Sequence, residues 1–175
     1  MPNGLALAIL LLVALLFFAY TVSLLLNFFT PFFTTPKKIL KDILPLFKLK
    51  KDEKFTDLGS GDGRVVFAVY RKYKSFSTGY EISPMLLIYF KLKKFLLFPF
   101  NRKIEIKEEN FLKTDLSKYD VIYCCLPMDL LEILEKKFEK ELKAGSRVFT
   151  YGYPLAKKKG KKISTSQKDI YQYTY

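Results

Sequence analysis

The sequence feature that most constrains the fold is a glycine-rich loop, DLGSGDGRVVFA, at residues 57–68. It contains three glycines, Gly59, Gly61 and Gly63. A strand-like run, KFTDL, leads into the loop, and an apolar pattern with helical spacing follows it over residues 63–73. Glycine tolerates backbone angles that other residues avoid, and it lets the chain approach a ligand closely. A loop of this kind between a strand and a helix is typical of α/β proteins that bind ligands at the carboxyl end of the first strand.

Strand-like and helix-like segments alternate along the rest of the chain. Strands are expected at residues 54–58, 76–81, 103–106, 119–126 and 147–151, and helices at residues 63–73, 84–97 and 128–142. The tail, residues 155–175, has the pattern of a loop followed by an antiparallel hairpin. Strands that alternate with helices predict a mostly parallel sheet with helices on both faces.

An uncharged apolar segment precedes this α/β pattern, from residue 4 to residue 29. At about 1.5 Å per residue, a helix of that length crosses the roughly 30 Å hydrocarbon core of a bilayer. A cleaved signal peptide is the main alternative, but no Lys or Arg precedes the segment and no Ala-x-Ala-like cleavage site follows it. A helix buried in a partner protein is a further alternative. The sequence favours a single transmembrane helix.

The residues after the apolar segment indicate its orientation and the domain boundaries. Lys37, Lys38 and Lys41 follow it, whereas its other flank carries no basic residue. By the positive-inside rule, this places the C-terminal part of the chain in the cytoplasm. Thr35 and Pro36 are expected to begin a helix, as its cap and its first residue. The chain then divides into a transmembrane anchor (1–30), a linker with an N-terminal helix (31–53) and a cofactor-binding domain (54–175).

The composition excludes some classes of enzyme. The chain has no histidine, so it can hold neither a Ser-His-Asp triad nor a His-ligated zinc ion, and no metal site is expected. Its two cysteines, Cys124 and Cys125, are neighbours in a strand-like run and should point to opposite faces. A disulfide between them is therefore not expected.

The net positive charge of the chain indicates which kinds of molecule it could bind. The formal net charge is +13, and lysines gather at residues 37–51 and 157–162. Such patches suit anionic lipid, an acidic protein or nucleic acid, and lipid is the simplest partner for a tethered domain. The segment FKLKKFLLFPF, residues 90–100, mixes aromatic residues with lysines. We expect it to pack on the sheet with only its lysines exposed; the alternative is that it lies on lipid headgroups.

The glycine loop does not match the loops that bind phosphates. The Gly-x-x-x-x-Gly-Lys pattern of nucleotide triphosphate loops is absent, and Arg64 stands where a dinucleotide loop needs its third glycine. Asp57 would repel a pyrophosphate but can attract the ammonium of S-adenosylmethionine, which carries no phosphate. Glu81, at the end of the second strand, can accept hydrogen bonds from two ribose hydroxyls.

Other residues complete the candidate cofactor site. Ser60 and Asp62 belong to the loop itself, and Asn110 and Phe111 follow the third expected strand. Asn110 can contact the adenine amine and Phe111 can cover the ring, although Asn110 can equally be a helix cap. A glycine loop alone can be only a tight turn. Its combination with two acids at successive strand ends favours a cofactor site.

With these features, the chain resembles the class I S-adenosylmethionine-dependent methyltransferases. PFFTTPKKIL, FTDLGSGDGRVVFA, TGYEISPMLL and the Leu-Pro after the fourth strand narrow the resemblance to the small protein-lysine methyltransferases. That family includes archaeal enzymes and the mitochondrial enzyme that methylates the ATP synthase c subunit. The resemblance implies a Rossmann-like, seven-stranded sheet ending in an antiparallel hairpin, S-adenosylmethionine as cofactor and lysine in a protein as substrate. The family often has Asp where this chain has Asn110.

Candidate substrate-pocket residues lie at the expected strand ends and before the first strand. They are Leu126, Pro127, Tyr151, Tyr153, Thr35 and Pro36. No catalytic residue is assigned, because methyl transfer from a sulfonium needs little acid–base help beyond a deprotonated amine. A membrane-anchored protein-lysine methyltransferase is the favoured function. A methyltransferase for a lipid, quinone or other small molecule and a non-catalytic cofactor-binding domain are the alternatives. Nucleic acid is not favoured as the substrate. Methyltransferases that act on amino groups of nucleic acids have an aromatic-Pro tetrad after the fourth strand, and this chain has CCLP there.

Overall fold

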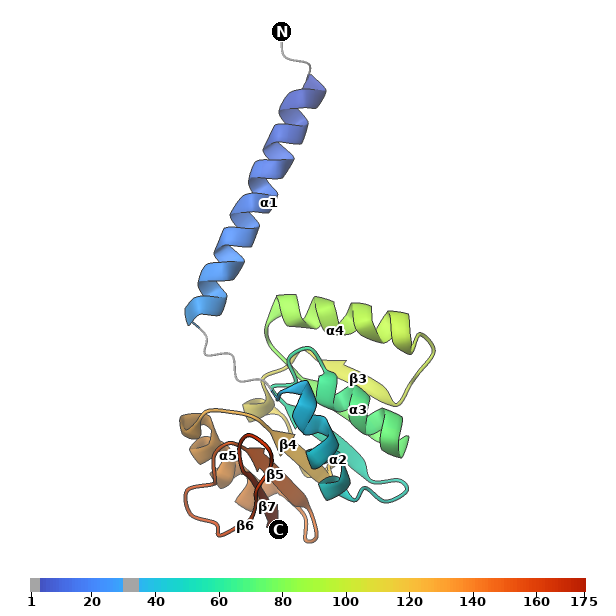
Figure 1. Cartoon of the computed structure of the whole chain (residues 1–175), viewed down its shortest axis with the longest axis vertical. Helices are drawn as coiled ribbons and strands as arrows, with labels where there is room; N and C mark the ends of the chain where they lie inside the picture. The colour runs from blue at the N-terminus through green and yellow to red at the C-terminus, as the bar shows by residue number, and fades with distance from the viewer. Residues whose placement is uncertain (1–3, 30–34) are drawn as a thin grey trace. The chain divides into compact units, whose positions relative to one another are not determined.

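The computed structural model describes residues 4–29 and 35–175, which belong to two compact units, Met1–Phe33 and Thr34–Tyr175. The described part of the first unit is helix α1 (Gly4–Phe29) (Figure 1). Its stretch Gly4–Val22 has a mean hydropathy of 2.8 and is long and apolar enough to cross a membrane, properties that a signal sequence near an N-terminus shares. Residues 30–34, part of the expected anchor and linker, lie outside the described residues.

The second unit is built on one seven-stranded sheet in the order β3-β2-β1-β4-β5-β7-β6 (Figure 1). The strands are β1 (Lys54–Leu58), β2 (Phe76–Tyr80), β3 (Ile104–Lys107), β4 (Val121–Cys124), β5 (Arg147–Tyr151), β6 (Lys161–Ile163) and β7 (Ile170–Thr174). The pairings among β1 to β5 are parallel, and β7 runs antiparallel to both β5 and β6. The expected fold, a mostly parallel sheet with a C-terminal antiparallel hairpin, is confirmed.

Helices cover both faces of this sheet. One face carries α2 (Leu40–Phe47), α3 (Arg64–Tyr73) and α4 (Pro84–Leu97), and the other face carries α5 (Met128–Glu141). On the first face, the ring of Phe47 packs against Phe55, Tyr123 and Phe149 from three neighbouring strands, at centroid distances of 5.3, 5.7 and 5.0 Å. On the other face, α5 buries Leu131, Leu134 and Phe138 in the core cluster of the sheet. The central strands β1, β4 and β5 are therefore buried on both faces, as strands of a covered parallel sheet are.

The chain before β1 differs from the expectation in its first turn. A short 3-10 helix, η1 (Lys37–Ile39), precedes α2, and Pro36 lies one position before it with extended backbone angles. Thr35 does not cap this turn; its hydroxyl lies 2.7 Å from the hydroxyl of Tyr123 instead. The expected cap and first residue are thus shifted by one position, because Thr35 is held by the sheet rather than by the helix.

The segment at residues 90–100 also differs from the expectation. The structure buries Phe90, as expected for packing on the sheet, but leaves Phe95 68% and Phe100 94% exposed. The prediction that only the lysines of this segment face solvent is therefore wrong. The apolar side chains run around more than one face of α4, and the sheet can cover only one of them.

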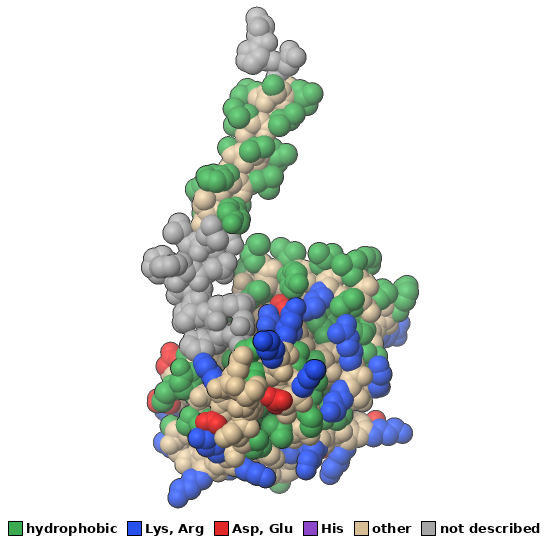
Figure 2. Space-filling model, in the orientation of Figure 1, with side chains coloured by type: hydrophobic (Ala, Val, Ile, Leu, Met, Phe, Trp, Pro, Cys, Tyr) green, Lys and Arg blue, Asp and Glu red, His purple; other side chains and the backbone are tan. Residues whose placement is uncertain are grey.

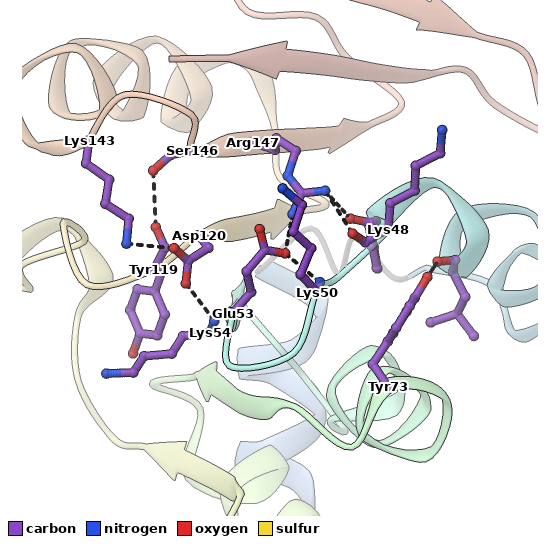
Figure 3. Close-up of polar contacts among 12 residues, drawn as sticks. Lys48, Lys50, Glu53, Lys54, Tyr73, Tyr119, Asp120, Lys143, Ser146 and Arg147 are labelled. Atoms are coloured by element: carbon purple, nitrogen blue, oxygen red, sulfur yellow. Dashed lines mark hydrogen bonds and ion pairs between the residues drawn. The ribbon is translucent and has the colours of Figure 1, made fainter.

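The amino edge of the sheet is closed by paired charges (Figure 3). Arg147 at the start of β5 forms an ion pair with Glu53 and donates from Nη1 to the carbonyl oxygens of Phe47 and Lys48, at 2.7 and 3.2 Å. Asp120 accepts a hydrogen bond from the backbone N–H of Lys54 and pairs with Lys143. These contacts tie the segment before β1 to the starts of β4 and β5.

Candidate cofactor site at the carboxyl edge of the sheet

The glycine loop has the backbone conformation that its sequence predicts. Gly59, Gly61 and Gly63 all have positive φ angles, of 77°, 55° and 72°. The backbone N–H groups of Gly59 and Ser60 donate to the carbonyl oxygen of Tyr80, at 3.0 and 2.8 Å. A Cβ on Gly63 would lie 2.2 Å from the ring of Phe90. The loop is therefore fixed between β2 and α4, and a side chain at Gly63 has no room.

Ser60 and Asp62 of this loop contact different parts of the structure. The Ser60 hydroxyl is buried and would lie 2.5 Å from a Cβ on Gly79, so it packs against β2 through the space that Gly79 leaves. Asp62 pairs with Arg64 at 2.7 Å and with Lys93 at 3.5 Å. Burial opposes ionisation of Asp62, but its hydrogen bonds with Arg64 outweigh burial and lower the pKa of its carboxyl.

Glu81 lies against the glycine loop, as its position after β2 predicted. Its Oε2 accepts a hydrogen bond from the backbone N–H of Gly61 at 2.8 Å, across 20 residues of sequence. Its Oε1 accepts from the N–H groups of Ile82 and Ser83, both at 2.9 Å. Three backbone donors therefore orient one carboxylate at the meeting point of the glycine loop and the start of α4.

Asp57, the last but one residue of β1, is the most buried charge of the site. Only 3% of its surface is exposed, and no hydrogen bond to its carboxylate is present among residues 4–29 and 35–175. Burial, then the charges of Glu81 and Asp62, raise the pKa of Asp57 well above its ordinary value of 3.8. A carboxylate in such surroundings favours a cation beside it, because a cation offsets both burial and repulsion.

Asn110 and Phe111 follow β3, where the sequence placed them. Asn110 Oδ1 accepts a hydrogen bond from the backbone N–H of Leu112 at 2.9 Å and so caps the 3-10 helix η2 (Phe111–Lys113). The helix-cap interpretation of its side chain is therefore correct. Phe111 is half-buried and packs against the core cluster under α5. Adenine contacts for these two residues stay a prediction.

The candidate substrate residues gather at the ends of β4 and β5. Leu126 lies beside the loop, since a Cβ on Gly59 would come within 3.0 Å of its Cδ2. The Tyr153 ring lies below the ammonium of Lys168, 5.8 Å away, and its carbonyl oxygen accepts from the Thr150 hydroxyl. Pro127 is the residue just before α5. These candidates, chosen from the sequence, therefore lie after the ends of two neighbouring strands, β4 and β5.

Tyr151 is the most buried of these candidates, with 4% of its surface exposed. Its hydroxyl forms no hydrogen bond of ordinary geometry within the described ranges, 4–29 and 35–175. Burial, and then the charge of Cys125, raise the pKa of Tyr151, while the nearby backbone N–H of Lys168 opposes part of the rise. The phenol therefore stays protonated at neutral pH and can serve as a hydrogen-bonding group but not as a base.

Two residues that the sequence did not assign connect this group to the loop. Arg64 donates from Nη1 to the carbonyl oxygen of Thr35 at 3.0 Å, while its Nε pairs with Asp62. Tyr123, which pairs with Asp57 in the register of β4 and β1, holds the Thr35 hydroxyl. The contact of Tyr123 with Thr35 spans 88 residues and had no sequence signal.

The site thus combines a tight glycine turn, a carboxylate after β2 and a buried carboxylate at the end of β1. This set suits a ligand with a ribose, a cationic end and no phosphate. Together with the strand order β3-β2-β1-β4-β5-β7-β6, it defines a class I S-adenosylmethionine-dependent methyltransferase. Comparison with known proteins agrees: a family model described as the ANTKMT methyltransferase domain matches residues 57–162. The chain belongs to this methyltransferase family, as the sequence resemblance implied.

Curated relatives extend this result. A protein-lysine N-methyltransferase of Saccharolobus islandicus is 29% identical over 126 residues, which cover 71% of this chain and 78% of the relative. The lysine N-methyltransferase of Homo sapiens that is named for the ATP synthase c subunit is 28% identical over 126 residues. The adenine nucleotide translocase lysine N-methyltransferase of Mus musculus is 27% identical over 125 residues. The matches span only 52% and 54% of these two mammalian relatives.

Solved structures show the same fold. An RNA methyltransferase from Salinibacter ruber in complex with S-adenosyl-L-homocysteine superposes with a TM-score of 0.75, at 22% identity, over 81% of this chain and 92% of that one. A methyltransferase from Thiobacillus denitrificans, also bound to S-adenosyl-L-homocysteine, gives a TM-score of 0.59 at 15% identity, over 76% of this chain and 56% of that one. S-adenosyl-L-methionine is the cofactor of the methyltransferase family that matches residues 57–162, whereas the shared fold itself does not select the substrate.

Proposed function

We propose that this chain is a membrane-anchored methyltransferase that methylates the side-chain amine of lysine in a protein, with a membrane protein as the favoured substrate. The observation that carries the proposal is the comparison with curated relatives: the archaeal, human and mouse proteins are all named as lysine N-methyltransferases. The archaeal relative is matched over 78% of its own length, so the shared part includes most of that enzyme. Nucleic acid is not the proposed substrate.

The geometry of the carboxyl edge supports a set of proposed cofactor contacts. We assign Asp57 to the ammonium of the cofactor, Glu81 to its ribose hydroxyls, and the backbone of residues 59–63 to close packing against it. Asn110 and Phe111 are assigned to the adenine. The raised pKa of Asp57 supports its role, because an ammonium beside this carboxyl would relieve the burial of its negative charge. The bound cofactor supplies an electrophilic methyl group on a sulfonium.

The chain's own residues must then present a neutral amine and exclude water. A lysine amine loses its proton more readily when it is buried, since burial disfavours the ammonium. Leu126, Pro127 and Tyr153 are assigned to the walls of this channel, and Thr35 and Pro36 to its N-terminal side. The buried hydroxyl of Tyr151 is assigned to orienting the amine by a hydrogen bond. No histidine is needed for these steps.

The domain division and the location are part of the same proposal. Residues 1–30 form the anchor, residues 31–53 the linker and N-terminal helix, and residues 54–175 the methyltransferase domain. The apolar stretch Gly4–Val22 supports a single span. Lys37, Lys38 and Lys41 support a cytoplasmic methyltransferase domain, and lysines near the surface add about 1 kcal/mol each toward anionic headgroups.

Methyl transfer from labelled cofactor tests the proposal. The full chain, in detergent or nanodiscs, is incubated with S-adenosyl-L-methionine that carries a tritiated methyl group and with a membrane extract. We expect a labelled protein band whose label resides on lysine after hydrolysis. Glu81→Gln should abolish the band, whereas Glu132→Gln, an exposed position on α5, should leave it unchanged.

Other distributions of the label would contradict the proposal. Label in the organic extract instead of the protein would identify a lipid, quinone or other small molecule as the substrate. Cofactor binding without any transfer, in the presence of the extract, would identify a non-catalytic binding domain. Label in RNA would identify a nucleic-acid substrate.

A further inference from the structure

The outer surface of α4 is an unusually apolar part of the second unit. The helix buries only Leu87 and Phe90, whereas most of its other apolar side chains are exposed. Six of them form one stripe, here called the α4 stripe: Met85, Ile88, Tyr89, Leu92, Phe95 and Leu96. Figure 2 shows hydrophobic side chains gathered in a ridge along α4. The spacing of three and four residues within the stripe places its members on one side of the helix.

Two further exposed apolar residues flank the α4 stripe. Ile82 before the helix and Phe100 after it are both exposed. Soluble monomers seldom expose contiguous apolar patches of more than a few hundred Å², so a ridge of this length indicates a surface that another molecule covers. The stripe carries only an open hollow, lined by Tyr89, Leu92, Lys93, Leu96 and Leu97. Such a surface suits a soft, continuous apolar medium better than an inserted peptide.

The charges beside the stripe favour an anionic surface. The sequence of α4, PMLLIYFKLKKFLL, contains Lys91, Lys93 and Lys94 but no acidic residue. Lys93 pairs with Asp62 and Lys91 with Glu108, both at 3.5 Å, and the pair of Lys91 is exposed. An apolar helix face bordered by lysines, with aromatic residues among the aliphatic ones, is the pattern of helices that lie in the bilayer interface.

We propose that α4 docks on an anionic lipid bilayer, with the α4 stripe inserted among the upper acyl chains and its lysines at the headgroups. The net charge of +13 complements such a surface. The inference rests on the membrane attachment in the proposed function, but not on lysine as the substrate. Because Ser83 precedes α4 and its backbone N–H donates to Glu81, docking would hold the cofactor site close to the headgroups. The substrates that reach it would then expose their lysines at that level.

Tryptophan fluorescence can locate α4, because the chain has no tryptophan of its own. Three full-length variants, each with a sole tryptophan, are reconstituted in phosphatidylcholine–phosphatidylserine vesicles whose acyl chains are brominated. Phe95→Trp reports on the α4 stripe. Ile133→Trp is the matched control, since it is 51% exposed on α5, on the other face of the sheet. Phe17→Trp reports on α1, and therefore on the anchor.

We expect Phe95→Trp to be blue-shifted and quenched several-fold by the brominated chains, and Ile133→Trp to remain water-exposed and unquenched. Adding Lys91→Glu to Phe95→Trp should lower the ratio of docked to free α4 by at least about fivefold, which corresponds to the contribution of one lysine near an anionic surface. Vesicles of phosphatidylcholine alone should lower it further.

Two results would overturn the proposal. Phe95→Trp that is unquenched while Phe17→Trp is quenched would show an inserted anchor and a free α4. A blue shift of Phe95→Trp without quenching would show that protein, such as α1 or a second copy of the chain, covers the stripe. By contrast, quenching of Phe95→Trp with Phe17→Trp unquenched would support docking and contradict the anchor alone.

Discussion

The two edges of the central sheet differ in how their charged side chains are paired. At the amino edge, two acids pair with bases: Glu53 with Arg147, and Asp120 with Lys143 (Figure 3). At the carboxyl edge, Asp57 is buried beside two other carboxylates, and the pKa of Asp57 is raised as a result. Within residues 35–175, the buried hydroxyl of Tyr151 at this edge also lacks a hydrogen-bond partner of ordinary geometry.

The amino ends of these strands therefore stabilise the fold, whereas their carboxyl ends are suited to binding a ligand. Paired charges and satisfied carbonyl groups at the amino edge stabilise the fold without a ligand. Like charges and an unpaired hydroxyl at the carboxyl edge destabilise the ligand-free protein, and a ligand with a cationic end relieves them. Substitutions at the two edges should therefore change unfolding and cofactor binding in different proportions.

The largest expected effect on stability is at the glycine loop, which lies at the carboxyl edge. Gly63→Ala should destabilise the protein by roughly 2–5 kcal/mol, because Gly63 has a φ of 72° and a Cβ would lie 2.2 Å from Phe90. Gly145→Ala is the control: its φ is 89°, but no atom lies within 4 Å of its Cβ position, so only the backbone term of about 1–2 kcal/mol remains. Urea unfolding measures both, and equal losses would contradict the packing argument.

The next effect is at the amino edge. Arg147→Met should destabilise the protein by roughly 2–4 kcal/mol, because it removes the ion pair with Glu53 and two hydrogen bonds to carbonyl oxygens. The affinity for S-adenosyl-L-methionine, measured by calorimetry on the folded variant, should stay within about twofold. A larger loss of affinity would mean that the two edges are coupled.

Cofactor binding should depend on pH through Asp57. The ammonium favours the ionised carboxylate, so binding should release protons below pH 7, where an α-amino group is already protonated. Affinity should fall by up to about tenfold per unit as the pH drops through the raised pKa of Asp57. Calorimetry in two buffers with different ionisation enthalpies measures the proton release. Asp57→Asn should release fewer protons; an unchanged release would assign the effect to another group.

The smallest effect is expected at Tyr151. Tyr151→Phe removes a buried hydroxyl without a partner of ordinary geometry within residues 35–175, so stability should stay constant or rise by up to about 1 kcal/mol. The rate of methyl transfer should nevertheless fall about tenfold, the effect of one hydrogen bond to the amine, with unchanged cofactor affinity. Tyr175→Phe removes another buried, unpaired hydroxyl of the same described range and should leave the rate unchanged. Equal rates in both variants would exclude the role proposed for Tyr151.

Much of the carboxyl edge could be predicted from the sequence, because its signals are local. Each parallel strand ends at that edge, so Asp57, the glycine loop and Glu81 had to meet once their strands were recognised. The contact of Thr35 with Tyr123 could not be predicted, since it joins residues 88 apart through tertiary packing. Asn110 fitted two interpretations, and only the structure shows that it caps η2.

The surface of α4 shows a different limit. Its sequence is apolar on several sides, so periodicity could not say which side faces the sheet. The core accepts Leu87 and Phe90, and most of the other apolar residues of the helix are exposed. The sequence predicted the bounds of this helix, residues 84–97, but not its outer surface.

The most direct test of the comparison between the two edges is the unfolding of Asp57→Asn with and without S-adenosyl-L-methionine. The raised pKa of Asp57 means that the native protein loses stability as the pH rises through that pKa. At pH 7 and without cofactor, the variant should therefore be more stable than the original chain by roughly 1–3 kcal/mol. The stabilisation by cofactor, about 2.7 kcal/mol at a hundred times its dissociation constant in the original chain, should largely disappear. A variant that is less stable without cofactor, or equally stabilised by it, would contradict the account.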